Sequence, residues 1–211
     1  MSYNNFLIID TSNYKPFVTL VINDDVVSTS FLNKSSLGID LENCIEKFLQ
    51  KNSNLNFISV CSGPGNFSST RTGVAFALGL QLSLDIPIVS WDSTIPFVSD
   101  FHSTFVNIID GGKKGCFVVL KEKVEEKLVI KSQLQFMLFD QLVEFLRENE
   151  CFCLVGPYLF NVKKFFFEKE IKCFFEEKDP NFLLLKDFCS TLFQNKQYSD
   201  NVHVTYLKEI N

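Results

Sequence analysis

The chain has 211 residues, a hydrophobic content of 46% and a formal net charge of −5 at pH 7. This length is sufficient for one large domain or two small ones with a real core, and the hydrophobic content excludes a largely disordered chain. No apolar run is long enough for a membrane span, and the acidic balance disfavours nucleic-acid binding by this chain alone.

The first residues and the cysteines indicate a cytoplasmic location. The opening Met-Ser-Tyr-Asn-Asn lacks the basic region of a signal peptide. Seven cysteines without zinc-like spacing fit reduced, buried thiols better than a disulfide framework. Cys151 and Cys153 flank one Phe on a predicted strand, and we expect core packing there rather than a redox or metal site.

The elements predicted in chain order form two similar halves. The first half contains three antiparallel strands followed by helix, strand, helix and strand, at 7–10, 17–20, 26–31, 39–51, 57–61, 68–84 and 87–90. A junction follows at 91–101. The second half contains strands at 105–110, 115–120, 127–130 and 152–155, a Phe-rich segment at 160–175, and helices at 139–149 and 182–194. This order predicts an α/β protein of the actin-like ATPase and sugar-kinase fold, with lobes at 1–99 and 100–211 and a reduced second lobe.

An internal echo supports the two lobes. Ile8-Ile-Asp10 and Ile108-Ile-Asp110 are each followed, without a gap, by Phe-Val-x-Leu at the same spacing. A repeat near half the chain length predicts a duplication. Asp10 and Asp110 are then expected at equivalent strand ends that face one cleft.

The most informative segment is Ser62-Gly-Pro-Gly-Asn-Phe-Ser-Ser-Thr-Arg-Thr-Gly73, between a predicted buried strand and a predicted buried helix. Gly63 and Gly65 around Pro64 favour a tight turn, and hydroxyls follow where the first helical N–H groups lack partners. Two interpretations remain open from these residues: a well-capped strand–turn–helix unit, or an anion or partner site at the start of the helix. The rarity of Arg in this chain, two against eighteen Lys, suggests that Arg71 serves as a planar, multi-donor group.

This segment resembles the G-P-G-S-F-T-G-x-R-x-G signature of the TsaB (YeaZ) family. Leu7-Ile-Ile-Asp-Thr-Ser12 looks like the opening strand of that family, Leu84–Ser90 like the strand after the signature helix, and Thr205-Tyr-Leu-Lys208 like its closing Y-L-R. The family serves bacterial synthesis of threonylcarbamoyladenosine in tRNA. The resemblance implies a non-catalytic subunit that supports the catalytic paralogue TsaD, with the ATPase TsaE as a further partner. It also implies contact with tRNA only through the complex, no membrane, a homodimer as an alternative assembly, and ATP or ADP only at the interface of the complex.

The resemblance places the docking face on the two helices of the first lobe. The residues implied are Leu41, Ile45, Arg71, Gly73, Val74, Ala77 and Leu78, with Gly63, Pro64, Gly65 and Phe67 shaping the turn that leads into the second helix. Gly73 and Ala77 lie one helical turn apart and would permit close approach of a partner helix.

Asp10, Thr11 and Ser12 are a second group of interest. An acidic residue at the end of a lobe-opening strand can hold a metal–nucleotide or activate water, and the adjacent hydroxyls resemble a phosphate-binding hairpin, here a vestigial one. The alternative is a turn-forming Asp that caps its own hairpin, which we favour for Asp110 and leave open for Asp10.

The sequence lacks the residues for catalysis of its own. His102 and His203 each stand alone, and we expect structural roles and no metal site. The helix that carries a histidine pair in the catalytic relatives reads Ser35–Glu42 here without His, which disfavours a peptidase. Only Gly156-Pro157 offers a glycine turn in the second lobe, a weak nucleotide contact. The alternative function is a small actin-fold ATP-dependent phosphotransferase or ATPase that uses Asp10 and the Gly63–Gly65 turn.

Overall fold

The computed structural model describes residues 4–52, 54–125, 127–198 and 202–205. The chain divides into two compact units, Met1–Ser93 with Phe182–Thr205, and Thr94–Asn181 with Tyr206–Asn211. No helix among the described residues has the length and apolar character needed to cross a membrane.

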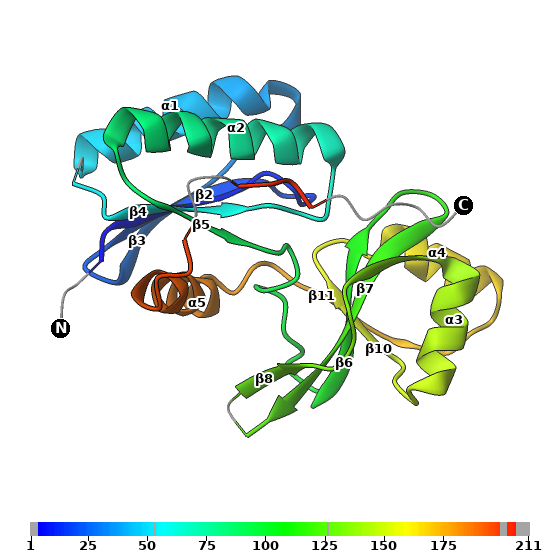
Figure 1. Ribbon diagram of the computed structural model, residues 1–211. Coiled ribbons are helices and arrows are strands. Elements are labelled where there is room, and N and C mark those ends of the chain that lie inside the picture. Colours follow the sequence, from blue (N-terminus) through cyan, green and yellow to red (C-terminus); the bar gives the residue numbers. More distant parts are fainter. Residues whose placement is uncertain (1–3, 53, 126, 199–201, 206–211) are drawn as a thin grey trace. The chain divides into compact units, whose positions relative to one another are not determined.

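Unit 1 is built on a five-stranded sheet in the order β3-β2-β1-β4-β5 (Figure 1). The first three strands are antiparallel, and β1, β4 and β5 are parallel. Their bounds are β1 Phe6–Asp10, β2 Phe17–Ile22, β3 Asp25–Phe31, β4 Phe57–Cys61 and β5 Ile88–Trp91. The helical segments are η1 Lys34–Ser36, α1 Leu37–Lys51, α2 Phe67–Leu84 and α5 Phe182–Gln194.

Both faces of this sheet are covered. Leu7 and Ile9 of β1 point toward α1 and α2 and share a core with residues of both helices. The opposite face packs against α5, where Phe182 contacts Phe17 edge-on and Phe193 stacks on Phe57 with ring centroids 4.4 Å apart. Because β1 and β4 are buried on both sides, they are continuous apolar runs rather than alternating ones.

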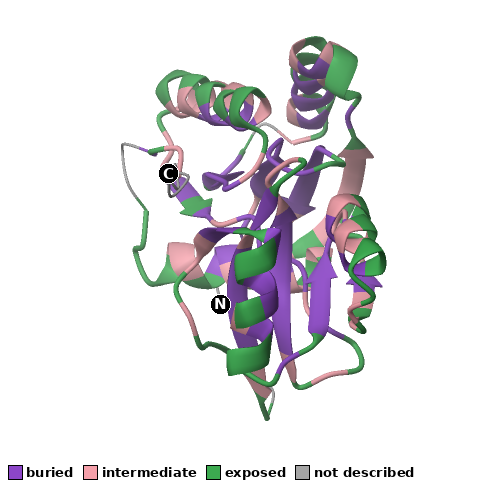
Figure 2. Cartoon of the chain, turned by 90° about the vertical axis from the view of Figure 1, so that its right-hand side faces the viewer, coloured by how far each residue is buried: buried purple, intermediate pink, exposed green. Residues whose placement is uncertain are grey.

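Unit 2 repeats this strand order with a six-stranded sheet, β11-β10-β6-β7-β8, in which β9 also pairs with β7. The strands are β6 Thr104–Asp110, β7 Gly115–Val124, β8 Lys127–Ile130, β9 Gln135–Leu138, β10 Cys153–Gly156 and β11 Phe174–Glu177. Helices α3 Phe139–Glu148 and α4 Phe160–Glu168 pack on one face around Val106 and Ile108. Figure 2 shows the strands as mostly buried, with exposed residues on the outer sides of the helices.

The second face of the unit 2 sheet is more polar. No helix covers this face among the described residues; the segment 94–103 lies against it through hydrogen bonds and through the buried ring of Phe97. Lys121 is fully buried, and its Nζ donates to the carbonyl and hydroxyl oxygens of Thr94 at 2.9 Å. Asn107, also fully buried, donates to the carbonyl oxygen of Phe97 at 2.8 Å.

The structure confirms the predicted α/β class and the actin-like strand order, and it corrects three details. The helix at 182–194 belongs to unit 1, whereas the sequence placed it in a lobe spanning 100–211. The Phe-rich segment at 160–175 divides into α4 and β11, and β9 was not predicted. The reduction of the second half lies in its helices, since α3 and α4 have 10 and 9 residues against 15 and 18 in α1 and α2, while its sheet is complete.

The internal echo also proves to be out of register. Asp10 pairs with Phe17, whereas Asp110 pairs with Cys116, so the second hairpin is one residue tighter. Ile9 packs on the face of the unit 1 sheet that α1 and α2 cover, whereas Ile109 packs on the face of the unit 2 sheet that lies away from α3 and α4. Because a one-residue slip reverses every side chain, Asp10 and Asp110 end comparable strands but point to opposite faces, and their predicted equivalence is wrong.

Candidate functional site

The signature segment forms a closed turn between β4 and α2 of unit 1. Its backbone is held from three sides. The Ser62 N–H donates to the carbonyl oxygen of Trp91 at 2.9 Å, the Ser93 hydroxyl donates to that of Pro64 at 2.5 Å, and the Asn66 N–H donates to that of Ser12 at 2.9 Å. The Gly63–Pro64 peptide bond is cis. The turn is therefore fixed by its own unit, as the interpretation of a capped strand–turn–helix requires.

Two glycines of the signature allow the β1–β2 hairpin to approach. A Cβ on Gly65 would lie 2.9 Å from the backbone carbonyl carbon of Ser12, and a Cβ on Gly73 would lie 3.1 Å from Cγ2 of Thr11. Neither position has room for a larger residue. The spacing of these glycines thus reflects contact with the hairpin rather than contact with a ligand.

The first turn of α2 is capped and partly exposed. Asn66 Oδ1 accepts a hydrogen bond from the Ser69 N–H at 3.0 Å, a typical N-cap. The guanidinium group of Arg71 lies over the ring of Phe67, 3.8 Å from its centroid. Phe67 is 55% exposed, so this cation–π pair presents a planar donor group at the surface.

The hairpin formed by Asp10, Thr11 and Ser12 is closed on itself. The Asp10 carboxylate accepts hydrogen bonds from the Ser12 N–H and hydroxyl at 2.8 and 2.7 Å and from the Asn13 side-chain amide at 2.7 Å. The Thr11 hydroxyl donates to the carbonyl oxygen of Ser69 at 2.6 Å. Burial raises the pKa of Asp10, although these hydrogen bonds oppose the shift. All three side chains are buried and engaged within unit 1, which favours the hairpin-capping role over a phosphate site.

Most of the residues predicted for docking are core residues instead. The hydrophobic core of unit 1 between the sheet, α1 and α2 includes Leu41, Ile45, Val74 and Ala77, and Gly73 is buried against Thr11. Leu41 and Ile45 of α1 and Gly73, Val74 and Ala77 of α2 face the sheet of their own unit, so these residues do not form an exposed docking surface. Leu78 is half-buried at the edge of this core, and Arg71 is exposed.

The outward side of α2 has a different set of small and apolar residues. Ala75 and Gly79 are exposed one helical turn apart, and a Cβ on Gly79 would meet no atom within 4 Å. Leu82, one turn further, is 84% exposed. Arg71 is the only charged residue between Asn52 and Leu84. The name "α2 face" is used below for Arg71, Ala75, Gly79 and Leu82.

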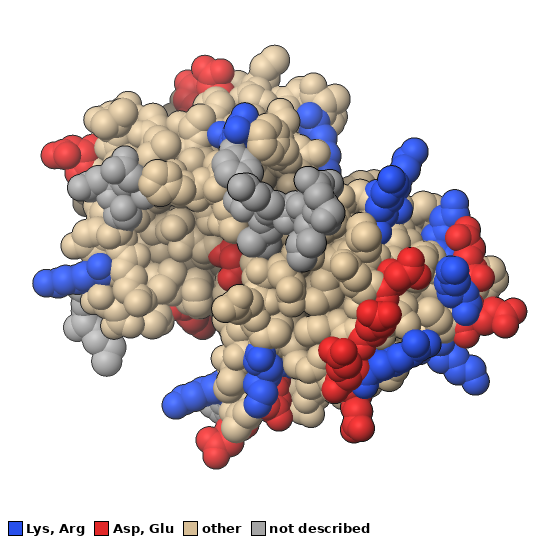
Figure 3. Space-filling view, turned by 45° about the vertical axis from the view of Figure 1, so that its right-hand side comes forward, with Lys and Arg blue, Asp and Glu red and all other residues tan. Residues whose placement is uncertain are grey.

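An open hollow of about 450 Å³ adjoins the end of the α2 face. It lies in unit 1 and is lined by Gln81, Leu82, Asp85, Ile86, Pro87 and Tyr198. Figure 3 shows few charged side chains on the visible part of unit 1, in contrast to their density over unit 2. A sparsely charged helical surface beside an open hollow is typical of a surface that meets another protein.

The residues of unit 2 that were considered for a nucleotide role have structural contacts within the unit. Asp110 is held by the side-chain amide of Asn161 on α4 at 3.0 Å. Gly156 ends β10, and a Cβ there would lie 3.2 Å from the carbonyl carbon of Ile108. Gly156 is thus explained by close packing against β6, as Asp110 is by contact with α4.

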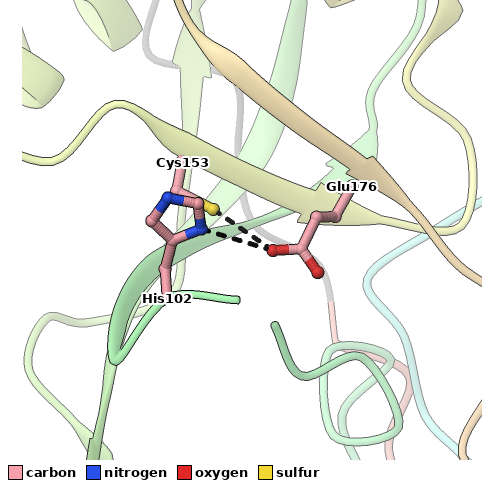
Figure 4. A group of neighbouring side chains, drawn as sticks. All are labelled: His102, Cys153 and Glu176. Carbon is pink, nitrogen blue, oxygen red and sulfur yellow. Dashed lines mark hydrogen bonds and ion pairs between the residues drawn. The ribbon is translucent and has the colours of Figure 1, made fainter. Parts of the chain in front are cut away.

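One cluster was not anticipated. His102, Cys153 and Glu176 of unit 2 come together although they are far apart in the sequence (Figure 4). The expectation that His102 stands alone was therefore wrong. No spacing signal links the three residues, because only the pairing of β6, β10 and β11 brings them to one place.

Taken together, the fold and the α2 face define an actin-like, two-unit α/β protein with a sparsely charged helical surface. A model of the family described as TsaD, tRNA N6-adenosine threonylcarbamoyltransferase, matches residues 37–185. The chain belongs to this family. The resemblance to TsaB (YeaZ) that the signature indicated is confirmed.

Two solved structures from Pseudomonas aeruginosa share the fold. One is YeaZ, with 12% identity, a TM-score of 0.77, and 97% of this chain and 100% of that chain covered. The other is a protein with similarity to peptidase YeaZ, with 13% identity, a TM-score of 0.75 and the same coverage. A search of curated proteins returned no match.

Proposed function

We propose that this chain is a non-catalytic partner subunit of the machinery that makes threonylcarbamoyladenosine in tRNA, and that it docks to the catalytic TsaD homologue through the α2 face. The observation that carries the proposal is an 18-residue surface helix whose exposed side carries Arg71 as its only charged residue. Membership of the TsaD family supplies the kind of partner.

The geometry of the α2 face suits a second helix. Ala75 and Gly79 would let a partner helix approach closely, while Leu82 and the Arg71–Phe67 pair would flank the contact. A guanidinium group over an aromatic ring is a common element of interface hot spots. The same face permits self-association, so a homodimer competes with the TsaD complex for this surface.

The two alanines of the chain provide a matched test, since both lie on α2. Ala75→Glu places a charge on the exposed side, and we expect a folded protein that no longer co-purifies with the TsaD homologue of the same cell. Ala77→Glu places the same charge in the core, where it is expected to destabilise unit 1 by at least about 3 kcal/mol. Leu183→Glu, on the exposed side of α5, is the surface control and should leave co-purification unchanged.

Circular dichroism and size-exclusion chromatography separate the outcomes. A folded Ala75→Glu protein that still binds the TsaD homologue would contradict docking through the α2 face. Loss of binding in Leu183→Glu as well would show that any added charge disrupts the complex, and would equally contradict the assignment.

The second part of the proposal is that the isolated chain has no enzymatic activity. The purified chain should hydrolyse no ATP and cleave no peptide above the buffer rate, because α1 has no histidine and Asp10 is sealed in its hairpin. ATP turnover that Asp10→Ala abolishes would replace this proposal with the phosphotransferase alternative.

A further inference from the structure

The cluster of His102, Cys153 and Glu176 lies at the amino ends of adjacent parallel strands in unit 2. Cys153 begins β10, Glu176 lies in β11, and His102 lies two residues before the start of β6. Val155 pairs with Glu176, so that the carboxylate lies on the same sheet face as the thiol of Cys153. The segment 94–103 covers that face and brings the imidazole to it.

The three side chains direct one ligand atom each toward a common point. His102 Nδ1 and Cys153 Sγ each lie 3.6 Å from Oε1 of Glu176, and all three atoms lie within 4.8 Å of one another (Figure 4). Nitrogen, sulfur and oxygen ligands around a tetrahedral zinc ion are separated by about 3.3–3.7 Å. Two of the three separations therefore already suit such an ion, and the third is at most 4.8 Å.

The ring nitrogen Nδ1 of His102 makes no hydrogen bond within the part of the chain that the structure describes, whereas the neighbouring groups of the cluster do. The Glu176 carboxylate is buried and is oriented by the Ser99 hydroxyl and, through Oε2, by the Asp100 N–H at 2.9 Å. The backbone N–H of His102 donates to Ser99 Oγ at 3.0 Å, and this hydrogen bond fixes the conformation of the segment 94–103 near the cluster. His102 Nδ1 is buried and has no hydrogen-bond partner among the described residues. In the tautomer protonated at Nε2, Nδ1 offers a lone pair beside the thiol and the carboxylate, and a cation would complete this arrangement.

A hollow connects the cluster with solvent. It has a volume of about 260 Å³ and is lined by His102, Thr104, Glu150, Cys151, Phe152 and Cys153. The His102 side chain is 41% exposed toward solvent. The hollow gives a cation a route of access and leaves room for a water molecule as a fourth ligand.

A Cys–His–Glu catalytic arrangement fits less well. In such a relay the thiol and the carboxylate contact the two different ring nitrogens, whereas Figure 4 shows both on the same side of the imidazole. Burial also raises the pKa of Cys153 to about 12, so the free thiol is a poor nucleophile. The ring nitrogen and the thiol instead both contact Oε1 of Glu176, which gathers the three ligand atoms in one place, as a chelating site requires.

We propose that His102, Cys153 and Glu176 form a binding site for one divalent cation of the zinc class. On binding, the Cys153 thiol releases its proton to solvent, and the thiolate and carboxylate balance the two positive charges. The mixed nitrogen, sulfur and oxygen set favours zinc over magnesium or calcium, which prefer oxygen ligands. The site lies in unit 2 and is independent of docking through the α2 face of unit 1.

Cobalt(II) is the probe for this site. The full chain is used, and a phosphine reductant keeps its cysteine thiols reduced. We expect one equivalent of Co²⁺ to bind with a thiolate-to-cobalt absorption band and intense visible bands of tetrahedral coordination, and one equivalent of Zn²⁺ to displace it. Cys153→Ser should abolish the thiolate band. His102→Gln and Glu176→Gln should each weaken binding at least tenfold.

Each variant has a matched control in the same chain. Cys151→Ser removes a thiol that lines the same hollow, and His203→Gln removes the only other histidine; both should bind cobalt as the parent chain does. A thiolate band that survives Cys153→Ser, or that disappears in Cys151→Ser, would overturn the assignment, as would the absence of stoichiometric binding. If Glu176→Gln does not fold, His102→Gln decides the question, because that side chain is partly exposed.

Discussion

Units 1 and 2 repeat one strand order, yet they cover the second face of their sheets in different ways. In unit 1, α5 packs there with stacked phenylalanines. In unit 2, the segment 94–103 lies there, tied down by Lys121, Asn107 and Glu176 through hydrogen bonds. Both second faces mix apolar and polar residues, but that of unit 1 is covered by a helix and that of unit 2 by a loop. The loop of unit 2 brings the buried nitrogen, oxygen and sulfur atoms of the His102 cluster together.

The helices that cover the first face differ as well. In each unit the second of these helices connects two parallel strands of the sheet, as α2 connects β4 to β5 and α4 connects β10 to β11. The outward side of α2 is small and uncharged apart from Arg71, whereas α4 exposes Lys164 and Glu168 as an i,i+4 ion pair. This contrast is the reason to assign protein docking to unit 1 rather than to unit 2.

The largest expected effect comes from adding a methyl group where each unit is tightest. Gly65→Ala would press on the backbone of Ser12 in unit 1, and Gly156→Ala would press on that of Ile108 in unit 2. Since a backbone obstacle cannot rotate away, we expect each variant to lose about 2–3 kcal/mol of unfolding free energy.

The single tryptophan makes the two losses distinguishable. Trp91 lies in β5 of unit 1, so urea unfolding followed by its fluorescence reports unit 1, while far-ultraviolet circular dichroism reports both units. Gly65→Ala should shift the fluorescence transition and Gly156→Ala should not. An equal fluorescence shift in both variants would show that the units unfold together and would weaken the comparison.

A second prediction tests the assignment of α5 to unit 1. Phe193→Ala removes a half-buried ring that stacks on Phe57, and we expect a loss of about 2 kcal/mol in the fluorescence-monitored transition. Phe167→Ala, on α4, removes a ring that is 85% exposed and serves as the control, with little change expected. If Phe193→Ala leaves the transition unchanged, α5 does not contribute to the core of unit 1.

The sequence predicted the order of elements well because the apolar runs and turns carry that information locally. It failed at α5, since no local pattern reveals that a helix near the end of the chain packs beneath the first sheet. It also failed at Asp110, because identical spacing in the sequence conceals a hairpin one residue tighter.

Only part of the candidate docking surface was predicted, because the sequence pattern does not show which side of α2 is buried. The signature identified α2, but composition alone could not tell its buried alanine, Ala77, from its exposed one, Ala75. The His102 cluster left no trace in the sequence, since its members depend on strand pairing.

The third prediction concerns Asp10 and Asp110, which the sequence repeat predicted to be equivalent. Burial raises the pKa of Asp10 above its unfolded value, so the folded protein binds a proton first as the pH falls. Unit 1 should therefore gain stability from this group as the pH falls from above the folded pKa toward 3.8, the unfolded value. Asp10→Asn should remove that part of the pH dependence, measured by fluorescence in urea.

Asp110→Asn is the control for this measurement. Asp110 lies in unit 2 on the opposite sheet face, beside Asn161, and its replacement should leave the pH dependence of the Trp91 transition unchanged. A parent slope that persists in Asp10→Asn would show that another group of unit 1 takes up the proton.

The smallest effect is expected at Gly79, and it has the opposite sign. Nothing lies within 4 Å of a Cβ at this exposed position of α2, so Gly79→Ala should stabilise unit 1 by about 0.5–1 kcal/mol through helix propensity alone. Because alanine would stabilise the helix more than this glycine, the glycine indicates that no side chain can project from the helix surface at this position. Gly79→Leu should therefore keep unit 1 folded but weaken co-purification with the TsaD homologue, while Gly79→Ala weakens it less. Equal binding by both variants would mean that the α2 face does not meet a partner helix closely, and the contrast between α2 and α4 would then be one of composition only.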